Sequence, residues 1–127
     1  PNRRVNLGPL GFYPTKNTRP LLKLAWRLFD VRWLTAWREE ANLIARWARL
    51  PKRPVLRGHA LLQDWKAQAA STLKNSGRRV AWIEDGISEE AKAIVLECGW
   101  TYFRCDTFVG VTDEHLKGLE EFAGGKP

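Results

Sequence analysis

The stretch "RRVAWIEDGISEEAKAIVLECGWTYFRCD", residues 78–106, decides the fold class of this chain. It starts with "RRVAWI", residues 78–83, which predicts a strand, passes through an acidic turn into a helix, and ends in a second strand over 100–106. Ser88 is a favourable N-cap for the helix, and Gly99 is a favourable terminator. The order strand, helix, strand predicts a βαβ unit with a short parallel sheet, so we expect an α/β fold.

Further helices and a further strand are predicted on either side of this stretch. Thr112 is a suitable cap for a final helix, and residues 59–75 carry an apolar stripe that ends at "NSG". Before them, "PVLR" at 54–57 is a candidate third strand, bounded by proline and glycine. Together these elements predict a small α/β unit over residues 51–127.

Residues 20–50 carry a different pattern, which is helical and amphipathic. Large apolar residues recur at offsets of three, four and seven and form one stripe: Trp26, Phe29, Trp33, Trp37, Ile44 and Trp47. This stripe predicts that the tryptophans are core residues. A basic face with Arg38, Arg46 and Arg49 lies nearly opposite. The pattern fits one long amphipathic helix, or two helices of which Asp30 caps the second.

Residues 1–19 are predicted to form an extended basic arm, because several prolines and glycines exclude a helix there. The arm still carries apolar side chains, including Phe12 and Tyr13, so we expect it to lie on the rest of the fold or on a partner. The chain has 127 residues, within the usual size of one domain. We therefore expect one globular domain built from the arm, the helical segment and the α/β unit.

Charge is distributed unevenly along the chain. Residues 1–80 contain 17 Lys and Arg against 4 Asp and Glu, a net charge of +13, whereas residues 81–127 contain 4 against 10, a net charge of −6. This asymmetry predicts one part that binds a polyanion and a second part that does not. The alternative is that the two parts neutralise each other within one fold.

The candidate contacts to a polyanion are the basic residues that cluster around the middle of the chain. They are Arg38, Arg46, Arg49, Lys52, Arg53, Arg57, Arg78 and Arg79. Arginine dominates this set, and its planar fork matches the oxygen atoms of a phosphate. We therefore predict a non-catalytic protein that binds DNA or RNA. It would act in a larger nucleoprotein assembly, such as a ribonucleoprotein, phage or replication complex, where protein partners are also expected.

Several kinds of chemistry lack support in the sequence. His59 and His115 are the only histidines, and with the two cysteines they lack the spacing of a zinc site. Neither a phosphate-binding loop nor a dinucleotide fingerprint is present. We therefore expect no metal and no cofactor, and favour a binding protein over an enzyme. Two cysteines and no apolar run near the ~20 residues of a membrane span predict free thiols in the cytoplasm or another reducing compartment.

The acidic turn "WIEDG", residues 82–86, supports a different function. Glu84 and Asp85 follow an apolar strand, at the end where α/β enzymes place metal ligands. The order of elements that follows resembles the C-terminal half of small PD-(D/E)xK nucleases, and the resemblance implies a metal-dependent nuclease that uses these two carboxylates. The turn departs from the family pattern, because Asp85 and Gly86 follow where the family carries Glu-x-Lys, and no lysine lies nearby in the sequence. The alternative is a solvated turn.

A third hypothesis treats the Arg- and Trp-rich helical segment as a protein interface. Arginine and tryptophan are enriched at binding hot spots. The protein would then be a small inhibitor or a structural protein of a virion.

Overall fold

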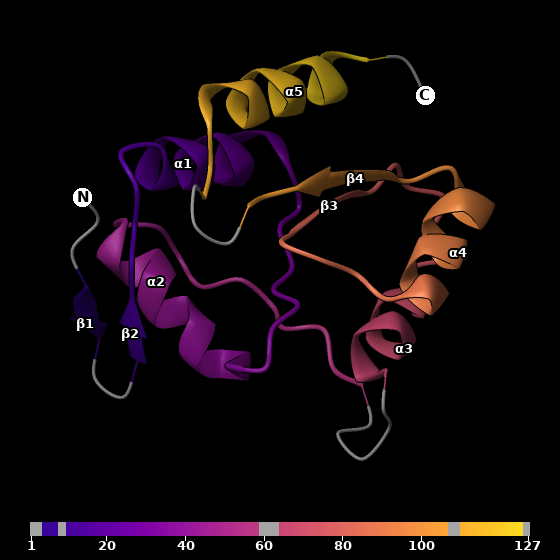
Figure 1. Ribbon diagram of the computed structural model, residues 1–127, viewed down its shortest axis with the longest axis horizontal. Coiled ribbons are helices and arrows are strands. Elements are labelled where there is room, and N and C mark those ends of the chain that lie inside the picture. Colours follow the sequence, from indigo (N-terminus) through magenta and orange to yellow (C-terminus); the bar gives the residue numbers. More distant parts are fainter. Residues whose placement is uncertain (1–3, 8–9, 59–63, 107–109, 126–127) are drawn as a thin grey trace.

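Figure 1 shows the computed structural model of the chain, which describes residues 4–7, 10–58, 64–106 and 110–125. The elements of this part of the chain are β1 (Val5–Leu7), β2 (Leu10–Phe12), α1 (Thr18–Leu28), the 3-10 helix η1 (Arg38–Ala41), α2 (Asn42–Trp47), α3 (Trp65–Ser71), β3 (Ala81–Glu84), α4 (Glu89–Cys98), β4 (Thr101–Arg104) and α5 (Asp113–Gly124). The strands form two small sheets, one antiparallel and one parallel. The chain is therefore a mixed α/β protein with a short parallel sheet, as the sequence predicts.

Strands β3 and β4 pair in parallel, with Trp82 opposite Tyr102 and Ile83 opposite Phe103. Helix α4 connects them along the chain, and its ends have the predicted caps. The Ser88 hydroxyl accepts a hydrogen bond from the Ala91 N–H at 3.1 Å. The residue after the helix, Gly99, has a φ of 66°, a conformation that glycine adopts at little cost. Local capping signals therefore fix this crossover.

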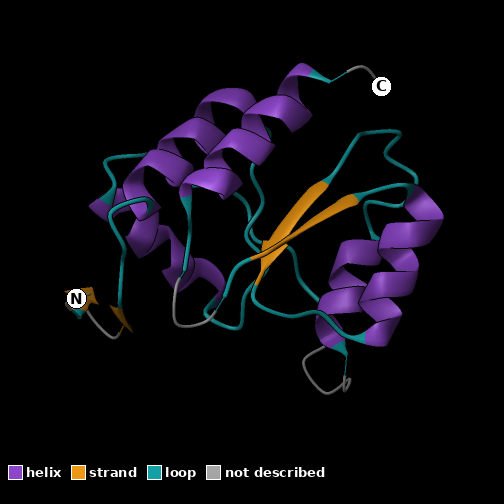
Figure 2. Cartoon of the chain, turned by 45° about the horizontal axis from the view of Figure 1, so that its top comes forward, coloured by secondary structure: helices purple, strands orange, loops and turns teal. Residues whose placement is uncertain are grey.

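Helices cover both faces of the parallel sheet (Figure 2). Successive side chains of a strand point to opposite faces. Trp82 and Tyr102 accordingly pack against α3 and α4, in a cluster with Ala67, Ala70, Ala91 and Trp100. Ile83 and Phe103 pack against α1 and α5, in a cluster with Leu21, Leu24 and Leu119. The core around the sheet thus has two halves, one on each side, and α2 buries further residues, among them Ile44 and Ala45.

Of the two alternatives for residues 20–50, one continuous helix is wrong and two helical segments are present, because the structure breaks the helix between Leu28 and Arg38. Within this break Trp33 is extended: its N–H donates to Pro54 O at 2.9 Å, and its carbonyl accepts from Leu56 N–H at 2.8 Å. These two bonds form an isolated parallel bridge to Val55. "PVLR" thus makes one bridge and does not join β3 or β4, and Asp30 does not cap the second helical segment.

The predicted burial of the tryptophan stripe holds only in part. Trp26 and Trp33 are half-buried and contact each other edge to face, with ring centroids 5.6 Å apart. Trp37 is 41 % exposed, so its assignment to the core is wrong. The buried tryptophans of the described residues are instead Trp82 and Trp100, which lie next to α3 and α4.

The N-terminal arm folds back on itself as an antiparallel hairpin, in which Val5 pairs with Phe12. The arm is therefore extended, as two paired strands rather than as a single one. The Phe12 ring meets the Trp47 ring edge to face, with centroids 5.1 Å apart. This contact fastens the hairpin to α2 and gives Phe12 a structural role, whereas Tyr13 is exposed.

The two remaining helices start at side-chain caps. Helix α3 begins after Asp64, whose carboxylate accepts from Ala67 N–H at 3.3 Å. The first part of the helix predicted over 59–75, residues 59–63, lies outside the described residues. Helix α5 begins after Thr112, whose N–H donates to His115 Nδ1 at 2.9 Å. The His115 Nε2 atom also lies 2.6 Å from Arg104 O, which ties α5 to the end of β4.

Candidate nucleic-acid interface

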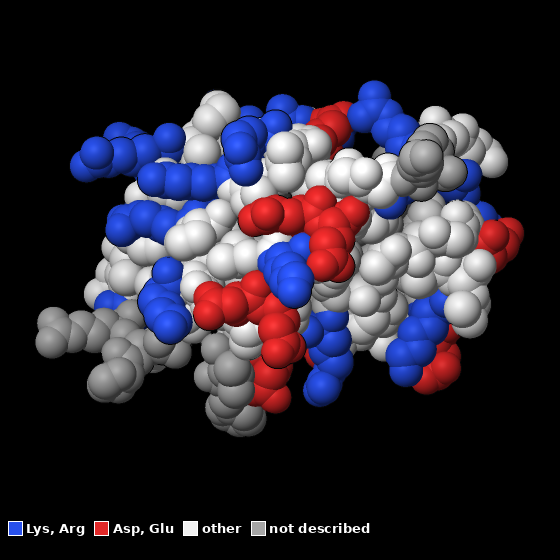
Figure 3. Space-filling view, turned by 90° about the horizontal axis from the view of Figure 1, so that it is seen from above, with Lys and Arg blue, Asp and Glu red and all other residues white. Residues whose placement is uncertain are grey.

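Basic and acidic side chains occupy different parts of the surface. In Figure 3, Asp and Glu gather in the middle of the face that α5 forms, whereas Lys and Arg dominate the left end, where α1 begins. Helix α5 contributes Asp113, Glu114, Glu120 and Glu121, with Lys117 among them. The opposite charges of the two parts of the chain are therefore separated on this face.

Three of the predicted contacts are available to a partner: Arg46, Arg49 and Lys52 are exposed at the end of α2 and just beyond it. Arg49 N–H donates to Arg46 O at 2.9 Å, so the chain turns directly after the helix. Lys52 follows three residues later, a separation of at most about 10 Å. Within the described ranges, none of the three side chains makes a hydrogen bond or an ion pair. Their charges thus lie together and uncompensated.

Helix α1 adds a basic row that the sequence reasoning missed. Arg19, Lys23 and Arg27 recur every four residues, all three are exposed, and the helix contains no acidic residue. The signal was present in the spacing of "TRPLLKLAWRL", because residues four apart share one face of a helix. The Arg19 guanidinium lies 4.0 Å from the centroid of the Trp47 ring, so this row meets the end of α2. We call Arg19, Arg46, Arg49 and Lys52 the basic corner.

Two other predicted contacts, Arg53 and Arg78, are committed to Asp30. Arg78 Nη1 lies 2.7 Å from Asp30 Oδ2, and Arg53 Nη2 contacts Asp30 Oδ1. Arg32 Nη2 lies 2.9 Å from Asp30 Oδ2 as well. The structure therefore brings Arg53 and Arg78 together, but around an acidic side chain of the chain itself, and we call these four residues the Asp30 cluster.

The electrostatics of the Asp30 cluster favour the ionised carboxylate. Burial raises the pKa of Asp30, but the hydrogen bond and charge of Arg32, together with Arg78 and Arg53, outweigh that effect and place the pKa below the ordinary value of 3.8. The carboxylate is therefore charged at neutral pH and holds three separate chain segments.

The other predicted contacts are bound elsewhere or half-buried. Arg57 forms an ion pair with Glu39. Arg79 donates to Phe122 O at 2.7 Å and lies over the Phe122 ring, so it supports α5. Arg38 begins η1 and is half-buried. Of the eight predicted residues, Arg46, Arg49 and Lys52 are therefore the ones best placed for a partner.

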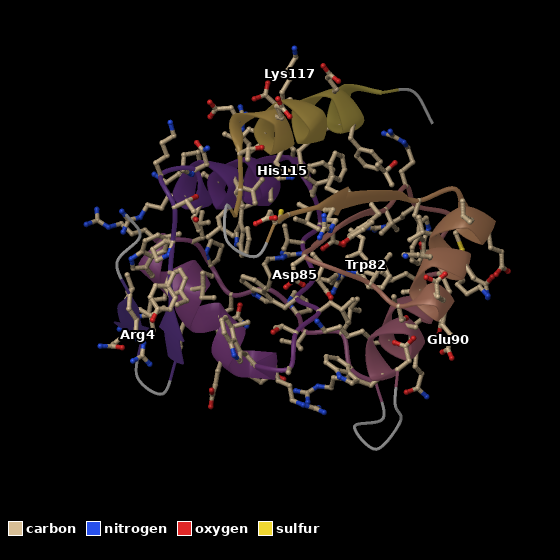
Figure 4. All side chains as sticks on the ribbon, viewed as in Figure 1. Arg4, Trp82, Asp85, Glu90, His115 and Lys117 are labelled. Atoms are coloured by element: carbon tan, nitrogen blue, oxygen red, sulfur yellow. The ribbon has the colours of Figure 1, made fainter. Side chains whose placement is uncertain are left out.

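A separate polar site lies at the C-terminal end of β3, toward the middle of the molecule in Figure 4. Glu84 Oε1 is 3.1 Å from Lys66 Nζ on α3 and 3.5 Å from Trp82 Nε1. The Glu84 side chain is 17 % exposed, so Glu84 is not part of a solvated turn, although Asp85 is exposed. Lys66 of α3 thus supplies the lysine that is missing from the sequence around Glu84. Because this lysine comes from a different element, no local sequence motif predicts the pair.

Burial and nearby acidic charge raise the pKa values of two neighbouring groups at this end of the sheet. Burial, and then the charge of Glu84, raises the pKa of Tyr102, whose hydroxyl donates to Glu84 O at 2.8 Å. Burial, and then the charge of Asp85, raises the pKa of the Cys105 thiol. Both groups are therefore held in their neutral forms at physiological pH.

Metal ligands do not gather in the part of the chain that the structure describes. No group of three or more His, Cys, Asp or Glu is found there that could hold a metal ion. Cys98 and Cys105 are both free thiols.

The fold and the surface define a mixed α/β protein with a short parallel sheet and a basic N-terminal half. No protein-family model matches the chain, and neither a curated protein nor a solved structure is significantly similar to it. Among the helices described, none combines the length and the apolar character needed to cross a membrane.

Proposed function

We propose that the protein binds nucleic acid without catalysis, chiefly through its phosphates. The observation that carries this proposal is the basic corner, where Arg46, Arg49 and Lys52 are exposed and no described acidic side chain compensates them. Arg19 extends this positive charge toward the row on α1. Such a surface suits a phosphate backbone, because each arginine can contact two phosphate oxygens.

Binding of this kind depends steeply on salt. Each phosphate contact on duplex DNA contributes about 0.9 to the slope of log affinity against log salt concentration. Three contacts at the basic corner therefore account for a slope of roughly 2.7, and the α1 row would add to it.

The decisive experiment is a salt titration of nucleic-acid binding with the triple variant Arg46→Ala, Arg49→Ala, Lys52→Ala. The expected result is weaker binding to every sequence and a slope that is less steep by about 2 to 3. The matched control replaces Lys74, Lys92 and Lys117 by Ala, which removes the same charge from another part of the chain. Equal losses in both variants, or none in the first, would contradict the proposal.

The separated charges support the proposal that the protein is one component of a larger assembly. The acidic face of α5 would point away from the nucleic acid or bind a basic protein partner. Capture of a protein that survives nuclease treatment and is lost in a Glu120→Gln, Glu121→Gln variant tests this part.

A second candidate function is Mg²⁺-dependent cleavage of phosphodiesters, favoured by the position of Lys66 beside Glu84. Mg²⁺ commonly binds one or two carboxylates together with substrate phosphates, so Glu84 and Asp85 suffice in number. Lys66 would contact a phosphate oxygen as a point charge. Cleavage that requires Mg²⁺ or Mn²⁺, is lost in Glu84→Gln and persists in the control Glu97→Gln would establish this activity. Full cleavage by Glu84→Gln would exclude it.

A further inference from the structure

The Asp30 cluster gathers three arginines from three separate segments of the chain. Arg32 follows Asp30 closely, whereas Arg53 and Arg78 come from positions 23 and 48 residues away. Arg78 lies just before β3, at the opposite end of the strand from Glu84. The cluster is therefore distinct from the polar site described above.

The charges of this cluster do not cancel. Three guanidinium groups surround one carboxylate, which leaves a net charge of +2 on the four side chains. A phosphate monoester carries close to two negative charges and three strong acceptor oxygens at neutral pH. We propose that the Asp30 cluster binds a terminal phosphate monoester, the phosphorylated end of a nucleic-acid strand.

Part of this site is held in place before any ligand arrives. The Arg53 N–H donates to Asn42 Oδ1 at 2.8 Å, and Asn42 Nδ2 donates to Arg53 O at 3.0 Å. Arg53 Nε is bound to Val31 O at 3.0 Å, which fixes the plane of the guanidinium. A fixed arginine loses little freedom when it binds an anion, so this residue forms the base of the site.

The other part remains accessible. The Arg78 side chain is 67 % exposed, and Arg32 is 37 % exposed. Each guanidinium has five N–H donors, so contact with one carboxylate oxygen leaves others for a ligand. Arg78 is therefore the side chain that a phosphate would reach first.

The chemistry favours a strand end over the middle of a strand. A backbone phosphodiester carries one charge and two free oxygens, whereas a terminal monoester matches both the +2 charge and the three arginines. Asp30 also competes with a ligand for the N–H donors of the three arginines, so a ligand with only one negative charge is disfavoured. This assignment rests on the proposed nucleic-acid binding, and it names the part of the ligand that this second site recognises.

The test compares oligonucleotides of one sequence that carry a 5′-phosphate, a 3′-phosphate or hydroxyl ends only, with fluorescence anisotropy as the readout. The wild-type protein is expected to bind at least one phosphorylated form about tenfold more tightly than the hydroxyl form. Arg78→Gln should abolish this preference. Lys74→Gln, which removes the same charge from a nearby turn, should keep it. Equal affinity for all three oligonucleotides would overturn the inference, and so would an unchanged preference in Arg78→Gln.

A second variant tests the competing role of Asp30. Asp30→Asn removes the negative charge that competes for the arginines, so inorganic phosphate should raise the melting temperature of this variant more than that of the wild type, with chloride at equal ionic strength as reference. The control Glu97→Gln should respond as the wild type does. A smaller response in Asp30→Asn would overturn the inference.

Two further results separate this inference from the proposed function. Absence of an end preference in the wild-type protein, with intact binding to the hydroxyl oligonucleotide, contradicts the inference alone. Binding that is unaffected by the triple variant at the basic corner contradicts the proposed function alone. A phosphoserine peptide that binds as tightly as the phosphorylated oligonucleotide would overturn the assignment to a nucleic-acid end.

Discussion

Lys66 Nζ lies 3.1 Å from Glu84 Oε1, and this contact joins the first turn of α3 to the last residue of β3. The two side chains are 33 % and 17 % exposed, so the pair is partly removed from water. Trp82 Nε1 lies 3.5 Å from the same carboxylate oxygen. Glu84 therefore connects a helix and the adjoining strand at one end of the sheet.

The first prediction is that Lys66→Met lowers the free energy of unfolding by about 1 kcal/mol, because Glu84 would be left half-buried without its cation. The methionine keeps the length of the side chain and so isolates the charge. Denaturant unfolding at neutral pH measures the difference. Lys74→Met is the control, since its partner Glu97 is 63 % exposed and such pairs contribute little. A loss of stability that is no larger in Lys66→Met than in Lys74→Met would contradict the prediction.

The second prediction concerns the Tyr102 hydroxyl, whose pKa is raised above 10.0 by burial and then by the charge of Glu84. Replacing Glu84 by Gln removes that charge, so the pKa of Tyr102 should fall toward 10.0. The protein has two tyrosines, and a Tyr13→Phe background leaves Tyr102 alone. The ultraviolet absorbance of tyrosinate, followed against pH, gives the result.

The raised pKa of Tyr102 also contributes to a decline of stability at alkaline pH. The unfolded chain loses the tyrosine proton first, so the stability from the protonated hydroxyl is complete below about pH 10 and declines as pH rises through the folded pKa. Tyr102→Phe in the Tyr13→Phe background should remove this part of the decline. An unfolding profile of identical alkaline slope in both proteins would contradict the assignment.

The third prediction follows from the lowered pKa of Asp30. A carboxyl whose folded pKa is depressed stabilises the fold above its unfolded pKa of about 3.9, and that contribution is lost as pH falls through the folded value. Asp30→Asn should therefore be less stable than the wild type at neutral pH, and the two should converge below pH ~4. Unfolding measured from neutral to acid pH checks the convergence. A gap that stays constant across this range would show that Asp30 does not act through its charge.

The parallel sheet could be predicted from the sequence because its signals are local. Ser88 and Gly99 cap the crossover helix within a few residues of its ends, and both caps are present. The sequence offers a break near Asp30 only as one of two alternatives, because the tryptophan spacing also fits a single helix. Trp33 is extended because its backbone bonds to Pro54 and Leu56, and these partners are distant in sequence.

The candidate interface likewise combines features that a local sequence pattern predicts with contacts between residues that are distant in sequence. Exposure of Arg46 follows from the helical pattern, which places it opposite the apolar stripe, whereas Arg49 is exposed in the turn beyond the end of α2. The commitment of Arg53 and Arg78 to Asp30 spans 23 and 48 residues, so no local pattern contains it. Charge clustering in a sequence thus indicates a basic region. The acidic side chains that pair with its arginines, and so reduce the positive charge available to a partner, are identified only in the fold.

The fourth prediction concerns His115, which joins the start of α5 to the end of β4. Its Nδ1 accepts from Thr112 N–H at 2.9 Å, so the ring proton lies on Nε2 and donates to Arg104 O at 2.6 Å. His115→Ala removes both bonds and should cost about 1 to 2 kcal/mol of unfolding free energy. His115→Gln should cost less, because a glutamine at this third helical position can still accept from the Thr112 N–H. Hydrogen exchange separates the two effects: the Thr112 amide should lose protection in His115→Ala and keep it in His115→Gln. Equal destabilisation by both substitutions would assign the role of His115 to the Arg104 contact alone.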